Sequence, residues 1–153
     1  MSTGSTGSSG GLLRDTTLAD LETAWQERDV EAAILEADGH GTTSLALRLY
    51  ALEIRVKTLI CKRLVLDHLP KHCKTHEPPE LLLFTGFSSE LDDSINAKIR
   101  RNWDLLVLFG KERLNSLRYL PSAKALNGYD LGFLLTALDD PNDGVLAWLS
   151  RHP

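Results

Sequence analysis

Three histidines and one cysteine lie close together near the middle of the chain. His68, His72 and His76 are spaced four residues apart, and Cys73 follows the second of them. Imidazole and thiolate groups are common zinc ligands. However, Pro70 interrupts any helix that would align His68 with His72, and no second pair of ligands follows at a distance. The pattern therefore favours a polar loop after a helix, with no cofactor; a metal site at His72, Cys73 and His76 is the weaker alternative.

Motifs of nucleophilic catalysis are missing from the sequence. It contains no Gly-x-Ser-x-Gly, no glycine-rich loop that could cradle phosphates, and no histidine paired with a carboxylate at a recognisable spacing. Cys61 is better explained as a small core residue than as a nucleophile. Trp25, Trp103 and Trp148 each fit an apolar helical stripe, which favours core packing over base stacking. The sequence thus leans away from an enzyme.

The charges are distributed in alternating blocks. The net charge is −4, which argues against a generic nucleic-acid binder. Residues 42–75 and residues 94–124 each carry seven basic and two acidic side chains, whereas the segments around them are acidic. Either neighbouring helices of opposite charge attract each other, or the two basic segments share one basic face.

The apolar periodicity predicts an all-α fold. Apolar residues recur at helical spacing, and Gly39, Pro70 and Pro121 provide stops between the runs. We expect an up-and-down helical bundle with short C-terminal helices, formed by one domain over residues 12–153. Residues 1–11 are rich in Ser, Thr and Gly and are predicted to be a disordered leader. The expected helices cover residues 18–37, 45–68, 94–120, 130–138 and 143–150, with a connector at 71–93.

The beginning of the chain lacks targeting features. It has neither a basic region followed by an apolar one nor, anywhere in the sequence, an apolar run of about 20 residues that could cross a bilayer. Two cysteines do not form a disulfide framework. We therefore expect a cytoplasmic protein with no membrane partner.

Three segments, in order, resemble the HEPN family of helical domains. Leu49–Arg63 is similar to the second helix of that family, with Glu53 and Lys57 as the matching polar pair at i,i+4. His76-Glu77 followed by Glu80-Leu81-Leu82 resembles the family's His-Asp-Leu-x-x-Leu stretch. Arg118-Tyr119-Leu120-Pro121-Ser122 resembles its Arg-Tyr-Pro ending. The likeness covers roughly residues 18–150.

The sequence departs from this family in three places. Pro78-Pro79 interrupts the His-Asp-Leu stretch, and Leu120 is inserted in the Arg-Tyr-Pro ending. The ribonuclease signature Arg-Asn-x-x-x-His begins at Arg101-Asn102, but Leu106 occupies the position of the histidine. Without an imidazole at that position, this motif offers no obvious residue to act as the general acid or base. Arg100, Arg101 and Asn102 are therefore predicted to bind nucleic acid without cleaving it.

The resemblance implies a non-catalytic binding or regulatory module of a prokaryotic toxin–antitoxin, antiphage defence or RNA-linked system. It also implies a homodimer, to which the apolar excess of residues 105–109 would contribute, with a protein partner encoded nearby and RNA as a candidate ligand. One alternative is an active, metal-independent HEPN ribonuclease that uses Arg63 and His68, which fit Arg-x4-His. Another is a helical protein-interaction adaptor without a nucleic-acid role. The ribonuclease alternative requires Arg63 and His68 to face a common, exposed cleft.

Overall fold

The computed structural model describes residues 16–152, and the predicted all-α fold is confirmed. No strand occurs among these residues; the pairing of Thr17 with His68 is an isolated β-bridge. The predicted leader, residues 1–11, lies outside the described residues. The α-helices of the described part are α2 (Leu18–Ala37), α3 (Gly41–Arg63), α4 (Pro78–Thr85), α5 (Ala97–Tyr119), α6 (Ser122–Leu126), α7 (Leu131–Asp139) and α8 (Val145–Ser150).

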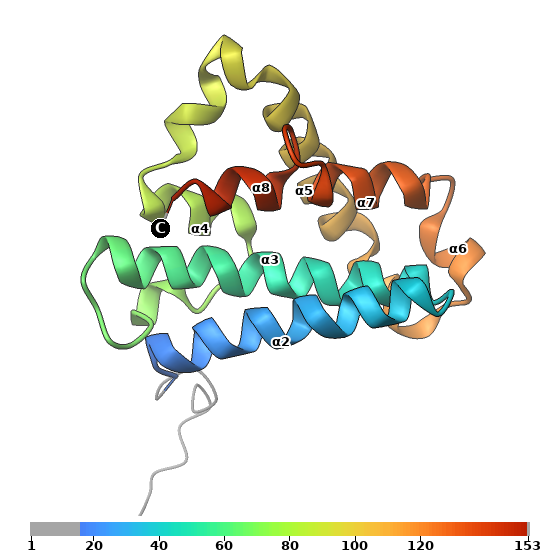
Figure 1. Cartoon of the computed structure of the whole chain (residues 1–153), viewed down its shortest axis with the longest axis horizontal. Coiled ribbons are helices and arrows are strands. Elements are labelled where there is room, and N and C mark those ends of the chain that lie inside the picture. The colour runs from blue at the N-terminus through green and yellow to red at the C-terminus, as the bar shows by residue number, and fades with distance from the viewer. Residues whose placement is uncertain (1–15, 153) are drawn as a thin grey trace, which may run out of the picture.

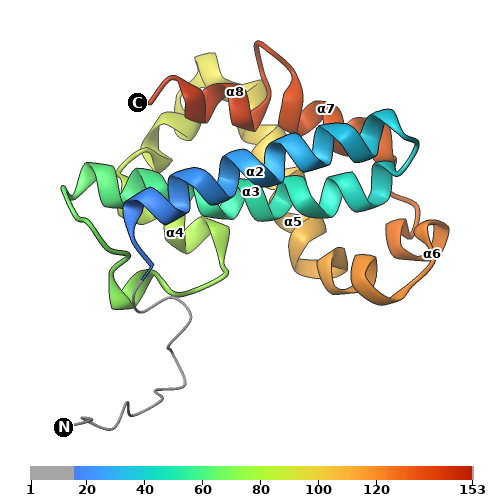
Figure 2. The same cartoon turned by 60° about the horizontal axis from the view of Figure 1, so that its bottom comes forward.

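Helix α3 is the central element of the fold. It pairs along its length with α2 on one side and also contacts α4, α5 and α7 (Figures 1 and 2). Its predicted apolar stripe is buried, as are Trp103 of α5 and Trp148 of α8, whose rings meet edge to face at 6.5 Å. Trp25 is half-buried instead, with the Arg55 guanidinium 4.2 Å above its ring. Two of the three tryptophans are thus core residues, as predicted.

A buried arginine joins three of the helices. Arg48 of α3 is 8% exposed, and its guanidinium donates to Asp139 of α7 at 2.6 Å and to Glu36 of α2 at 2.7 Å. Burial raises the pKa of Asp139, although the positive charge of Arg48 opposes that shift. Lys62 of α3 and Glu22 of α2 form a further ion pair at 2.5 Å. Opposite charges on neighbouring helices therefore hold α2 against α3, as the first interpretation of the charge blocks predicted.

Several predicted helix boundaries were wrong. The second long helix ends at Arg63 rather than near His68, because Val65 and Leu66 donate back to Lys62 and Cys61 and close its last turn. The third begins at Ala97, since residues 94–96 form a 3-10 turn. Helix α6 was not predicted, and α4 lies within the segment that was expected to be a connector.

Within residues 16–152, no helix is both long and apolar enough to cross a membrane.

Candidate functional site

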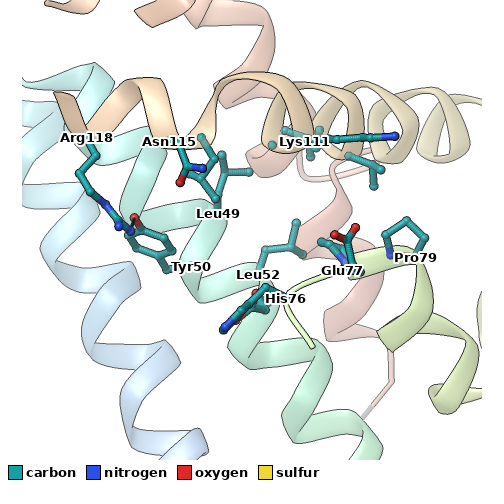
Figure 3. A pocket seen from close by; sticks show the side chains of 15 residues that line it. Leu49, Tyr50, Leu52, His76, Glu77, Pro79, Lys111, Asn115 and Arg118 are labelled. Atoms are coloured by element: carbon teal, nitrogen blue, oxygen red, sulfur yellow. Dashed lines mark hydrogen bonds and ion pairs between the residues drawn. The ribbon is translucent and has the colours of Figure 1, made fainter. Parts of the chain in front are cut away.

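A cleft of about 710 Å³ lies between α3, α5 and the loop that leads into α4 (Figure 3). Leu49 and Leu52 of α3 and Leu106 of α5 are among the apolar residues that line it. Its polar lining residues are Tyr50, Glu53, His76, Glu77, Lys111, Asn115 and Arg118. A cavity of this volume, lined by both apolar and polar side chains, is a candidate ligand site.

The three segments that resemble the HEPN family meet at this cleft. Glu53 comes from α3, His76 and Glu77 from the loop before α4, and Arg118 from the last turn of α5. Glu53 and His76 are 23 residues apart in the sequence, and Arg118 follows 42 residues after His76, so the fold brings these side chains together. Leu106, at the position where the family's histidine would stand, is 2% exposed and belongs to the base of the cleft.

A buried ion pair supports one wall of the cleft. Lys57 is 2% exposed, and its Nζ lies 3.3 Å from Oε2 of Glu53, one turn earlier in α3. The predicted i,i+4 pair is therefore confirmed. The Glu53 carboxylate also lies 3.1 Å from Nδ1 of His76, whose ring is otherwise exposed. One carboxylate thus neutralises a buried ammonium and anchors the loop that carries His76.

Cationic side chains stand at the opposite side of the cleft. Arg118 donates to the hydroxyl of Tyr50 at 3.1 Å, and this hydrogen bond raises the pKa of Arg118. Lys111 is exposed, and no carboxylate of residues 16–152 lies within ion-pair distance of it or of Arg118. Figure 3 shows Lys111, Asn115 and Arg118 following one another along α5 above the cleft. Both positive charges are therefore available to an anionic ligand.

The structure does not bring the predicted metal ligands together. Cys73 is buried, whereas His72 is exposed and His76 contacts Glu53. Over residues 16–152, no group of three histidine, cysteine or acidic side chains is arranged to hold a metal ion. Both cysteines are free and buried, and burial raises the pKa of each thiol. Neither therefore has the lowered pKa that a reactive thiolate requires.

Arg63 and His68 do not line a common cavity: Arg63 lines a second, smaller cavity, and His68 lines neither that cavity nor the cleft. The Arg63 guanidinium lies 5.5 Å from the centre of the Phe87 ring, in a second cavity of about 370 Å³ that His68 does not line. His68 pairs through its backbone with Thr17 at the start of α2. The residues of the ribonuclease alternative thus have different neighbours.

The three residues predicted to bind nucleic acid, Arg100, Arg101 and Asn102, differ in their bonding partners. Arg100 is held between Asp92 at 2.6 Å and Asp104 at 3.1 Å. The Asn102 side chain donates to the backbone carbonyl of Asp143 at 2.8 Å. Arg101 is exposed, and among the described residues no carboxylate lies within ion-pair distance of it. Only Arg101 of the three is free to meet a phosphate, and it does not line the cleft.

Tyr50, Lys111 and Asn115 line the cleft but were not predicted to be site residues. One signal was present: Lys111, Asn115 and Arg118 recur at i, i+4 and i+7, which places them on one face of a helix. The contribution of Tyr50 could not be anticipated, because it depends on the packing of α3 against α5.

We predict that Glu53→Gln lowers the free energy of unfolding by about 3–5 kcal/mol, because it leaves the Lys57 ammonium buried without a counter-charge. Adding Lys57→Met should restore most of that loss, since the buried charge is then removed as well. Chemical denaturation of the two single variants and the double variant measures the interaction free energy between Glu53 and Lys57.

Asp104→Asn is the matched control, because Arg100 and Asp104 form an exposed pair at the same i,i+4 spacing. It should cost less than about 1 kcal/mol. Equal, small losses for Glu53→Gln and Asp104→Asn would contradict a structural role for the buried pair.

Comparison with known proteins gives no match for this chain, whether with protein-family models, with curated proteins or with solved structures.

Proposed function

We propose that this chain is a HEPN-like module that binds single-stranded RNA in the cleft between α3 and α5 and does not cleave it. The observation that carries this proposal is the meeting of the three HEPN-like segments at one cleft, where Lys111 and Arg118 have no carboxylate partner within residues 16–152. The resemblance suggests RNA as the ligand, and the geometry supplies groups suited to it.

The cleft offers both kinds of contact that single-stranded RNA uses. Arg118 and Lys111 can contact phosphates, the guanidinium through paired hydrogen bonds. Tyr50 supplies an aromatic ring of the kind on which bases stack. The negative charge of Glu53 is compensated by Lys57, so Glu77 is the one carboxylate of the lining that lacks an ion-pair partner within residues 16–152. The balance at the cleft therefore favours an anion.

We infer binding without cleavage because α5 carries Leu106 at the position where the family's ribonuclease signature has its histidine. Leu106 cannot act as an acid or a base, and the cations at the cleft bind phosphate without moving a proton. His76 is the imidazole of the cleft lining, and we assign its contact with Glu53 to attaching the loop before α4, a role that the His76→Ala assay below tests. The alternative of a ribonuclease that uses Arg63 and His68 is not supported, because His68 does not line the cavity that Arg63 lines and pairs with Thr17 instead.

The module would act as a homodimer in the prokaryotic cytoplasm, regulated by a protein partner encoded nearby. Leu108 is 47% exposed and supports the idea that the apolar segment at 105–109 contributes to the dimer, whereas Leu106 and Phe109 are buried within the chain. A role in toxin–antitoxin or defence systems rests on the family likeness. The adaptor alternative draws support from the ion pairs between α2 and α3, which explain part of the charge pattern without a ligand.

We predict that Lys111→Gln combined with Arg118→Gln weakens binding of a short single-stranded RNA. Because each lost phosphate contact reduces counterion release, the slope of log affinity against log salt should become shallower by roughly 1.4. Fluorescence anisotropy over a salt series measures both quantities.

The matched control is Lys98→Gln combined with Arg151→Gln, which removes the same charge from exposed positions outside the cleft. It should leave the slope nearly unchanged. If both double variants change the slope equally, binding is distributed over the surface and the cleft is not the site; if the unmodified chain binds no RNA, the adaptor is favoured.

We also predict that the purified chain does not cleave RNA faster than its Arg101→Ala variant, since neither Arg101 nor Leu106 can transfer a proton. Gel analysis of labelled RNA, with and without a chelator, measures this. A wild-type activity that survives chelation and is abolished by His68→Ala or His76→Ala, with the fold intact, would establish a ribonuclease instead.

A further inference from the structure

Asn115 brings an unengaged amide group to the cleft. It is exposed on α5, and its side chain has no hydrogen-bond partner within residues 16–152. The side chains of Asn96 and Asn102, by contrast, donate to the backbone carbonyls of Glu90 and Asp143. An asparagine amide offers a hydrogen-bond donor and an acceptor side by side. The cleft therefore contains a neutral group that can form two hydrogen bonds to one ligand.

This amide stands between the two cations that are available to a ligand. Lys111 lies one turn before Asn115 on the same face of α5, and Arg118 lies one turn after it (Figure 3). With a rise of about 1.5 Å per residue, the two cations are attached about 10 Å apart along the helix axis. Arg118 also donates to the Tyr50 hydroxyl at 3.1 Å, which holds the aromatic ring beside this row. The order along α5 is thus cation, amide, cation.

A nucleotide within an RNA chain presents the complementary order. Its base is flanked by one phosphate on the 5′ side of the sugar and another on the 3′ side. The edge of an unpaired base displays a donor beside an acceptor, which an asparagine amide can bind through two hydrogen bonds. A ligand with phosphates alone would leave the amide unused, and an isolated base would leave the cations unused.

We propose that Asn115 reads the base of one nucleotide, while the phosphates on either side of that base contact Lys111 and Arg118. The base stacks on Tyr50, over the apolar residues of the cleft such as Leu49. This inference rests on the proposed RNA binding and adds the group that is recognised, an unpaired base rather than the phosphate backbone alone. The pairing edges of bases in a duplex are already occupied, so a double-stranded RNA would not satisfy the amide.

The test compares a short single-stranded RNA with a base-free ribose-phosphate oligomer of the same length, by fluorescence anisotropy of each with the full chain. The base-free oligomer should bind at least about tenfold more weakly, because stacking on Tyr50 and the contact with Asn115 are both lost. Asn115→Leu keeps the shape of the side chain without the amide. It should weaken binding of the RNA about tenfold and leave binding of the base-free oligomer unchanged. The salt slope should also stay unchanged, since no phosphate contact is removed.

Asn142→Leu is the matched control, because Asn142 is also exposed, has no side-chain hydrogen bond within residues 16–152 and lies outside the cleft lining. It should bind both oligomers as the unmodified chain does. Equal affinity of the unmodified chain for both oligomers would overturn base reading while leaving phosphate binding in the cleft intact. Unchanged RNA binding by Asn115→Leu, or an equal loss for both oligomers, would do the same. Binding of neither oligomer would refute the proposed RNA binding together with base reading.

Discussion

A buried ammonium group has to be neutralised close by, and in this fold Glu53 fulfils that requirement for Lys57. The two residues are one turn apart in α3, the helix that contacts most of the other elements. Because removing only one partner would leave an uncompensated charge in the core, the carboxylate is fixed in position. The same carboxylate meets His76, so the loop before α4 is attached to α3 and forms a wall of the cleft. The same carboxylate therefore both neutralises the buried charge and positions one wall of the cleft.

The total charge of a segment is a poor guide to its binding surface in this chain. Segments 42–75 and 94–124 are both basic, yet Arg48 is occupied by Glu36 and Asp139, and Arg100 by Asp92 and Asp104. Such pairs stabilise the packing of helices or are screened at the surface. The informative cations are therefore those without a carboxylate partner among the described residues, and at the cleft they are Lys111 and Arg118.

The sequence predicted the parts of the structure that depend on local periodicity. The helical class, the buried stripe of α3 and the pairing of Glu53 with Lys57 follow from spacings of three and four residues. The end of α3 was mispredicted because Val65 occupies a position that glycine normally signals. The Arg48 cluster and the link between Tyr50 and Arg118 join residues distant in sequence, so they depend on helix packing that periodicity does not encode.

We propose that RNA binds in the cleft between α3 and α5. The most direct measurement is a nuclear magnetic resonance titration of the isotope-labelled chain with a short single-stranded RNA. Binding in the cleft should shift the amide signals of Tyr50, His76 and residues 107–118, with little change at Arg101 or Arg63. Shifts centred on Arg101, or on Arg63 and His68, would contradict it, as would a spectrum that RNA leaves unchanged.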